Sequence, residues 1–341
     1  MTDSTATTEG GAPQRPALAA SGRLSRATIV DRLAGLVALV SAGLAILVVG
    51  LVIAFLAVKA TPVFSNAAIG AGSFFTSFNW QPDFAVKGSG GGFGGDTGPF
   101  ATFGALTPIF GSVEVVVIAL VIAVPVALSL ALVLEETDPV IGQRFLRPAI
   151  EIFVGIPSVV YGYLGFTVLR PLFRPLAAQG GGQGEGLLLA GVVLAIMVVP
   201  TIATLSADGL RSVPRSLKEA SMALGATQWQ TMYKVLVPAA RSTIISGVVL
   251  GLARAMGEAL AVSLVIGNVN QLPQFDKYGL HAFIQPTLTM TTTITQNIQN
   301  IAIEPEATAA RYMLSIVLLV ITFLCILAVR FLNRHAQQVV S

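Results

Sequence analysis

The sequence predicts an all-α membrane protein with six transmembrane helices, and two observations carry this prediction. Hydrophobic residues make up 54% of the 341 residues and charged residues only 11%, with a mean hydropathy of +0.79. A soluble fold could not cover that much apolar surface. The apolar residues are also collected into six runs, each about as long as the ~20 residues that cross a bilayer as a helix.

The chain divides into an N-terminal tail, a transmembrane domain and a short C-terminal tail. Residues 1–28 begin with a stretch rich in Thr, Ala, Pro and Gly and are predicted to be a disordered cytoplasmic tail. The transmembrane domain covers residues 29–335, and residues 336–341 form the second cytoplasmic tail. The first apolar run is too long for a signal-peptide core and is predicted to be a retained span. The six predicted spans are residues 33–58, 109–134, 149–169, 187–207, 243–267 and 311–332.

Basic residues indicate how these spans are oriented. If the N-terminus lies inside the cell, most Arg and Lys residues near span ends fall on the cytoplasmic side, as the positive-inside rule requires. Arg170 and Arg174 fall outside and weaken this pattern without reversing it. We therefore expect both termini, and the loop at residues 211–241, to be cytoplasmic.

Prolines interrupt three of the predicted spans. Pro125, Pro157 and Pro200 each remove a backbone hydrogen bond, so we expect kinks at these positions. Kinked helices around a water-filled path are found in transporters, but they also occur in other membrane proteins.

The sequence contains no convincing nucleotide site. A glycine tract at residues 88–98 formally satisfies GxGxxG, but no strand precedes it and no helix follows at once, so a flexible external loop is predicted. The P-loop pattern GxxxxGK[ST] is absent. If this protein uses ATP, another subunit must hydrolyse it.

The composition also excludes several kinds of chemistry. Cys325 is the single cysteine and lies in an apolar run, which excludes an intrachain disulfide and a cysteine-based metal cluster. His281 and His335 are the only histidines, and the HExxH and GxSxG motifs are absent. We expect no metal, no other cofactor, no nucleic-acid partner and no covalent reaction.

The loop at residues 211–241 predicts two short helices that meet at a glycine corner. Pro214 suits the opening turn of the first helix, and Gly225 lies just past its end. Thr227 and Gln230 fit a capping box that begins the second helix. This second helix is expected to present three large side chains on one face: Trp229, Met232 and Tyr233.

The predicted span 243–267 carries two charges near its midpoint, Arg254 and Glu258. A charge at mid-helix costs about 2.5 to 3.5 kcal/mol on insertion, so these side chains must face a bundle interior or an aqueous cavity. Because they are four residues apart, they can meet on one helical face. They form either a structural ion pair or a fixed cation for an anionic substrate, with Glu258 holding the guanidinium in position and accepting a proton from a protonated oxyanion. Gly247 and Gly251 form a GxxxG pattern that allows close approach by a neighbouring helix.

In its residue order, the segment 219–238 resembles the EAA loop of ABC importer permeases. The matching positions are Glu219, Ala220 and Gly225, whereas Ser221 replaces the second alanine of the pattern. The resemblance implies the type I ABC importer permease fold and assigns the contact with an ATPase subunit to Glu219, Ala220 and Gly225.

A second set of segments resembles permeases of the Pst phosphate importer, and PstC more than its sister PstA. The RAxGE pattern of that family matches residues 254–258, and further matching segments are GIPSVVYG at 155–162, NWQP at 79–82, FGALTPIFGS at 103–112 and PTLTMTTTI at 286–294. The resemblance covers roughly residues 30 to 335. It implies that Arg254 and Glu258 line the substrate pathway of a multi-pass plasma-membrane protein.

The resemblance also implies partners. They are a second, PstA-like permease, two copies of a PstB-like ATPase, an extracytoplasmic phosphate-binding protein and the lipid membrane. Our hypothesis is therefore a permease subunit of an ATP-driven phosphate importer. Three alternatives remain open: an ABC permease for another oxyanion such as sulfate or molybdate, an ion-coupled secondary transporter with Glu258 as its proton site, and a structural membrane scaffold.

Overall fold

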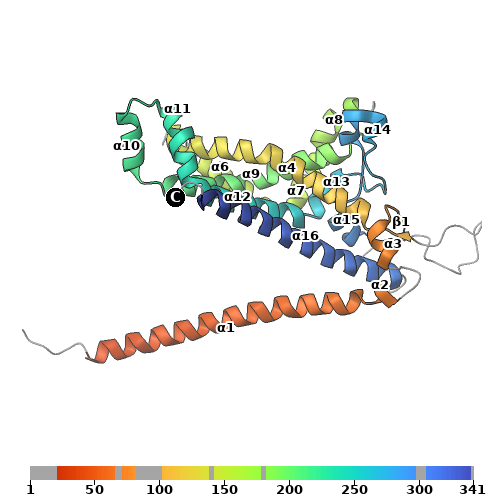
Figure 1. Cartoon of the computed structure of the whole chain (residues 1–341), viewed down its shortest axis with the longest axis horizontal. Coiled ribbons are helices and arrows are strands. Elements are labelled where there is room, and N and C mark those ends of the chain that lie inside the picture. The colour runs from red at the N-terminus through yellow and green to blue at the C-terminus, as the bar shows by residue number, and fades with distance from the viewer. Residues whose placement is uncertain are drawn as a thin grey trace, which may run out of the picture. The chain divides into compact units, whose positions relative to one another are not determined.

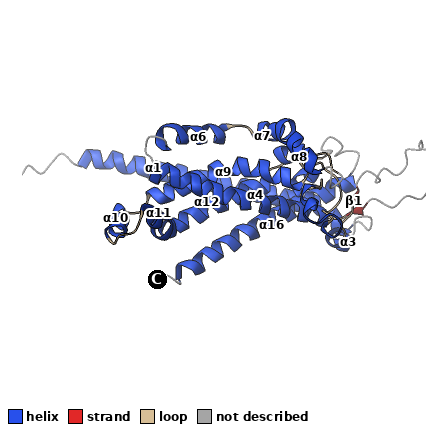
Figure 2. Cartoon of the chain, turned by 90° about the horizontal axis from the view of Figure 1, so that it is seen from above, coloured by secondary structure: helices blue, strands red, loops and turns tan. Residues whose placement is uncertain are grey.

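The computed structural model describes residues 21–65, 71–81, 102–137, 142–177, 182–296 and 305–338. Helices make up most of this part of the chain, as the colours of Figure 2 show. Two short strands are described, β1 (Trp80–Gln81) and β2 (Thr102–Phe103), which pair antiparallel with Trp80 opposite Phe103. The predicted all-α class is confirmed.

Parts of the predicted tails and loops lie outside the described residues, namely 1–20, the glycine tract 88–98 and 339–341. Residues 21–28 are described, and they belong to helix α1 (Ser21–Ala60) rather than to a disordered tail. Leu, Arg and Ala in this stretch are good helix formers, so the helix of the following span extends backwards through it. At the other end of the chain, α16 (Pro305–Gln338) likewise continues past residue 335.

The chain forms two compact units, Met1–Phe55 and Leu56–Ser341. In the first unit, α1 carries no charged residue from Leu33 to Phe55. A helix that is apolar on all sides belongs in lipid or in a large apolar core.

Helix α9 (Leu187–Arg211) is the centre of the second unit. It packs against both α4 (Leu106–Leu132) and α12 (Val237–Gly257), and 67% of its most apolar stretch is buried, more than in any other candidate span of the described residues. Small residues permit this packing, because a Cβ added at Gly251 would lie only 2.7 Å from Ile202 Cγ1 of α9. The close approach predicted from Gly247 and Gly251 is therefore made by α9.

Within the described residues, five helices are long and apolar enough to cross a membrane, and a sixth span is obtained if one bent pair of helices counts as a unit. The bent pair replaces the predicted span 149–169. It consists of α6 (Arg147–Gly155) and of α7 (Ser158–Leu164), which continues through the π-helical turn Gly165–Leu169 into α8 (Arg170–Ala177). The two arms make an angle of 97°.

Pro157 explains this break. The residue before a proline is pushed out of the helical region, and Ile156 is accordingly extended, with φ −69° and ψ 128°. Pro125 and Pro200 instead remain inside continuous helices, α4 and α9.

The predicted span 243–267 also differs from expectation. The apolar helical segment begins earlier, at Gln228, and ends at Gly257, and a separate short helix, α13 (Leu260–Val265), follows. Helix α13 packs against α7, so the two broken regions lie next to each other. They come close at Gly162 and Ala261, where a Cβ added at Gly162 would lie 2.8 Å from the Ala261 Cα.

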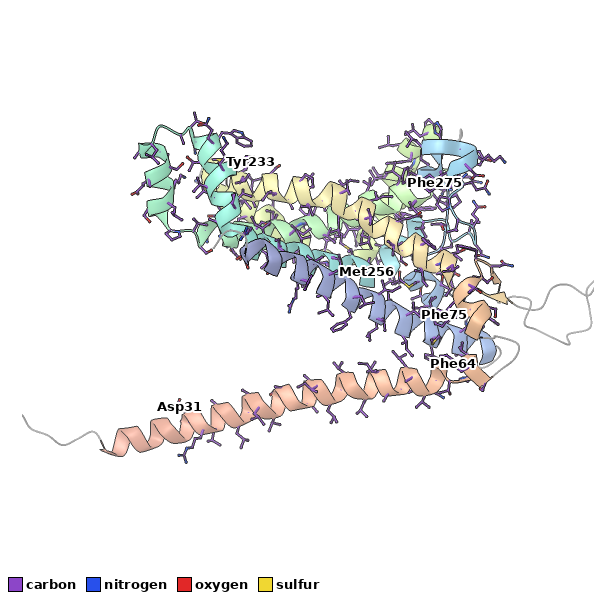
Figure 3. The ribbon with its side chains drawn as sticks, in the orientation of Figure 1. Asp31, Phe64, Phe75, Tyr233, Met256 and Phe275 are labelled. Carbon is purple, nitrogen blue, oxygen red and sulfur yellow. The ribbon has the colours of Figure 1, made fainter. Side chains whose placement is uncertain are left out.

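The second unit has two distinct ends. Helices α10 (Arg215–Ala223) and α11 (Gln228–Thr231) form an elbow at one end, and α8 and α14 (Phe275–Tyr278) lie at the other (Figure 1). Figure 3 shows Tyr233 and Phe275 at these opposite ends and Met256 between them. The remaining elements are α2 (Pro62–Ser65), α3 (Ala71–Thr76), the π-helical turns Val133–Thr137, Gly142–Leu146 and Met232–Leu236, the 3-10 helix Gly279–Ile284 and α15 (Met290–Thr295).

Candidate functional site

The helix break after α12 places Glu258, which is partly buried, between the ends of two helices. Gly257 is the last residue of α12, and Glu258 is extended, with φ −77° and ψ 118°. The first backbone N–H groups of a helix have no partner within it. Glu258 Oε1 accepts the N–H of Ala261 at 3.2 Å and so satisfies one of these donors at the start of α13.

Arg254 has a different partner. It lies in the last turn of α12, where the helix dipole favours a positive charge, and its Nη1 donates to Thr201 Oγ1 of α9 at 3.2 Å. The expectation that Arg254 and Glu258 meet on one helical face is therefore wrong, because the helix ends at Gly257 and the four-residue spacing no longer aligns them. Each charge is held at a separate place along the break.

A hydroxyl-rich segment closes the other side of the break. Thr291 Oγ1 donates to the backbone oxygen of Glu258 at 2.9 Å, and Ser112 Oγ of α4 accepts the N–H of Met290 at 2.7 Å. The segment before α15 approaches α4 so closely that a Cβ at Gly111 would overlap the Leu288 carbonyl oxygen. The chain at the start of α15 is thus anchored to α4 and to the helix break.

Between these anchors lies a cavity of about 10 Å³, enough for about one water molecule. Its polar lining consists of Ser112, Glu258, Thr289 and Thr291, and the rest of its wall is apolar. The three hydroxyl residues were not predicted as site residues. Thr289 and Thr291 belong to a run of threonines within 287–293, which is their signal in the sequence, and Ser112 lies far from this run. Only the fold brings the three residues next to Glu258.

The elbow carries the residues expected to contact an ATPase. Glu219, Ala220 and Gly225 are all exposed, and no residue of α10 is buried. Gly225 has φ +85°, a conformation that favours glycine. The predicted capping box of α11 is confirmed, because Thr227 Oγ1 accepts the Gln230 N–H at 3.2 Å and Gln230 Oε1 accepts the Thr227 N–H at 2.9 Å.

The predicted face of three large side chains on the second helix is wrong in part. Trp229 and Tyr233 are 67% and 66% exposed, whereas Met232 is only 6% exposed and packs into the bundle. Met232 begins the π-helical turn Met232–Leu236, whose extra residue per turn shifts side chains relative to an α-helix. Together with Leu224, which is 90% exposed, Trp229 and Tyr233 leave large apolar side chains uncovered on the elbow.

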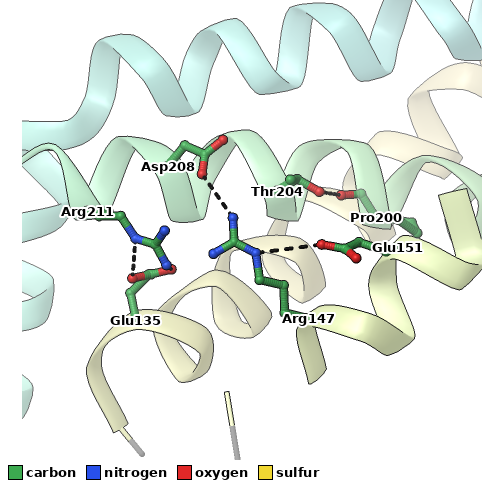
Figure 4. A network of polar contacts seen from close by, with 7 residues as sticks. All are labelled: Glu135, Arg147, Glu151, Pro200, Thr204, Asp208 and Arg211. Carbon is green, nitrogen blue, oxygen red and sulfur yellow. Dashed lines mark hydrogen bonds and ion pairs between the residues drawn. The ribbon is translucent and has the colours of Figure 1, made fainter. Parts of the chain in front are cut away.

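Ion pairs tie the base of the elbow to the ends of the spans, and sequence analysis did not identify them (Figure 4). Arg211, the last residue of α9, binds Glu135 through two hydrogen bonds of 2.8 and 3.1 Å. Arg147 of α6 lies 4.0 Å from Asp208 of α9 and 3.8 Å from Glu151. These pairs join α6 to α9, and the end of α9 to the π-helical turn Val133–Thr137 that follows α4. A cavity of about 400 Å³ separates α10 from Glu135 and Arg211.

The bundle with its broken helices and exposed elbow has the fold of the membrane subunits of type I ABC importers. It resembles a bacterial ABC transporter involved in the import of the acidic polysaccharide alginate, with a TM-score of 0.53 and 14% identity over 92% of this chain and 99% of that one. It also resembles the MetNI methionine ABC transporter in an inward-facing conformation, with a TM-score of 0.51 and 19% identity over 68% and 95% of the two chains. At these identities, the likeness concerns the fold alone.

The chain belongs to the family described as binding-protein-dependent transport system inner membrane component, which matches residues 123–340. It is a multi-pass membrane protein. It is 41% identical to the probable ABC transporter permease protein YqgH of Bacillus subtilis, over 83% of this chain and 84% of that protein. It is 36% identical to the phosphate transport system permease protein PstC of Xylella fastidiosa strain Temecula1, over 76% of this chain and 78% of that protein.

Proposed function

We propose that this chain is a PstC-type permease subunit of an ATP-driven importer that moves inorganic phosphate across the plasma membrane into the cell. The observation that carries the proposal is the position of Arg254 and Glu258, two partly buried charged residues at a helix break that follows an apolar span. Ionisable side chains within such spans mark substrate pathways in membrane proteins. Similarity to permeases named for phosphate transport supports the choice of substrate.

The chemistry of these two residues suits phosphate. The planar guanidinium of Arg254 offers several donors in a fixed geometry to an oxyanion. Glu258 uses Oε1 for the Ala261 N–H, so Oε2 remains an acceptor for the acidic proton of a partly protonated phosphate. Sulfate carries no such proton at neutral pH, which gives the site a means of discrimination.

Other subunits supply the energy and the substrate. We assign these roles to two PstB-like ATPase subunits, a PstA-like second permease and an extracytoplasmic phosphate-binding protein. With both termini in the cytoplasm, the elbow would face the ATPase, and Glu219, Ala220 and Gly225 would form the contact. The ion pair between Glu135 and Arg211 would carry the elbow's movement to α4 and α9.

The proposed role of Arg254 as an anion-binding residue is tested with the complete complex in proteoliposomes. The measurement is ATP-dependent uptake of radiolabelled phosphate. We expect Arg254→Gln to abolish uptake while the complex still assembles, and Arg144→Gln, which removes an exposed arginine, to leave uptake unchanged. Normal uptake by Arg254→Gln would reject the anion-site role. Loss of the variant from the membrane would indicate that Arg254 is structural.

The substrate is tested by competition in the same vesicles. A large excess of sulfate should leave phosphate uptake unaffected, and strong mutual inhibition would favour a permease for another oxyanion. The Glu258→Gln variant keeps an oxygen that can accept the Ala261 N–H but has no carboxylate for the substrate proton, so sulfate should inhibit it more than it inhibits the unmodified protein.

A further inference from the structure

The hydroxyl groups beside the helix break are buried and arranged toward one cavity. Ser112, Thr289 and Thr291 are 5%, 2% and 7% exposed, and they come from α4 and from the start of α15. Thr289 Oγ1 and Thr291 Oγ1 lie 3.2 Å apart, and both residues line the cavity together with Glu258. Sequence segments that are far apart thus place three hydroxyls around one acidic residue.

This cavity is too small for a tetrahedral oxyanion as it stands, since about 10 Å³ holds about one water molecule. Its polar contacts are also the ones that hold the wall together, because Thr291 bonds the Glu258 backbone oxygen and Ser112 bonds the Met290 N–H. A hydroxyl can rotate and exchange one partner for another. The arrangement therefore has the properties of a closed constriction whose own hydrogen bonds can be replaced by those of a substrate.

The charge around the cavity limits which substrate fits. Arg254 donates to Thr201 and is not part of the lining, so the donors available there are uncharged hydroxyls, and Glu258 is the acidic residue of the lining. A fully deprotonated anion would meet the carboxylate without a proton to share. A tetrahedral oxyanion with at least one acidic proton can donate to Glu258 and accept from the threonines.

We propose that Ser112, Thr289 and Thr291 form, with Glu258, the selective constriction of the transport pathway, and that it admits protonated tetrahedral oxyanions such as phosphate and arsenate. This inference rests on the proposed function and adds residues to it. In the open state, Thr291 releases the Glu258 backbone oxygen and donates to an oxygen of the substrate. The same movement frees α15 from the helix break and widens the cavity.

The decisive comparison is between two buried threonines of the same helix. Thr291 lines the cavity, whereas the Thr293 hydroxyl, which is 0% exposed, donates to the Thr289 backbone oxygen at 2.7 Å and is not part of the lining. In the reconstituted complex, Thr291→Val should raise the KM for phosphate or lower the uptake rate by about tenfold, the effect of losing one hydrogen bond to a charged ligand. Thr291→Ser should restore uptake, and Thr293→Val should stay within about twofold of the unmodified complex.

A second measurement does not depend on transport by the variant. Thr291→Cys, in a chain with Cys325→Ser, should react with a small thiol reagent during ATP turnover, and phosphate or arsenate should slow the reaction whereas sulfate should not. Thr293→Cys should remain unreactive. Equal behaviour of the Thr291 and Thr293 variants in both measurements would overturn the constriction while leaving phosphate transport intact. A complex that takes up no phosphate before any substitution would instead refute the proposed function.

Discussion

Gly225 determines the conformation of the elbow at the scale of a single residue. Its φ of +85° turns the chain between α10 and α11, and an added Cβ would meet nothing within 4 Å. The glycine is needed for its backbone conformation, since L-residues with a side chain pay about 1–2 kcal/mol in the left-handed region. A larger side chain at Gly225 would therefore not clash with the rest of this chain. It would affect the protein through backbone strain and through contact with a partner that covers the corner.

We predict that Gly225→Asp abolishes phosphate uptake while the binding protein still delivers phosphate to the complex. The substitution places a carboxylate on the surface proposed to contact the ATPase. The measurement is uptake together with phosphate-stimulated ATP hydrolysis in proteoliposomes, with Gly225→Asn as control, because Asn and Asp both tolerate positive φ and differ here in charge. Uptake that continues without the ATPase would show an ion-coupled transporter instead.

Residues at the break show what sequence could and could not predict. Arg254 and Glu258 were identified because mid-span charges are costly, and this reasoning needs only composition and position. Their pairing was predicted wrongly because it assumes a continuous helix, and the spacing of the charges contains no sign that the chain becomes extended at Glu258. The cavity hydroxyls lie some 180 residues apart along the chain, from Ser112 to Thr291, and only tertiary structure brings them together.

At the scale of elements, the ends of the helices near the elbow are joined by charge as well as by apolar packing, because the Glu135–Arg211 pair adjoins an apolar cluster that includes Leu134 and Leu210. The side chain of Glu135 is only 11% exposed and that of Arg211 is 46% exposed. A two-bond contact between a guanidinium and a carboxylate has a defined geometry. Removing one partner of a partly buried pair leaves the charge of the other partner unpaired. This pair therefore fixes the end of α9, from which the chain enters the elbow, relative to the π-helical turn that follows α4.

We predict that Glu135→Arg and Arg211→Glu each lower the amount of phosphate moved per ATP hydrolysed, and that the double charge exchange recovers most of it. Like charges would face each other in the single variants and opposite charges in the double variant. Uptake and ATP hydrolysis are measured in the same vesicles, so that a coupling ratio is obtained. Single variants with an unchanged ratio, or a double variant no better than the singles, would contradict a role for this pair in transmission.

For the molecule as a whole, hydropathy predicted the number and order of the spans well because lipid imposes a length of about 20 residues on each helix. It could not predict that two spans would be broken. At Pro157 the sequence suggested a kink but not its size, and the structure has a 97° bend there. The tail at 21–28 was misjudged for a related reason, since a helix that is stable in its span propagates into a stretch of mixed composition.

The prediction at this scale concerns assembly. Purification of the native complex through a tag on this chain should also recover a second, different permease and an ATPase in twice the amount of this chain. Each of the two permeases would bind one ATPase copy through its elbow. Mass spectrometry of the intact complex gives the composition and the ratios. Recovery of this chain alone, or of a homodimer without ATPase, would argue for the scaffold or secondary-transporter alternatives.

Helix α10 contributes no buried residue to the bundle. Substitutions along α10 are nearly neutral for the stability of the transmembrane core, so recognition of one motor subunit rather than another can change without endangering the pathway. Exchanging α10 between two related permeases should therefore transfer their choice of ATPase and leave their choice of substrate untouched.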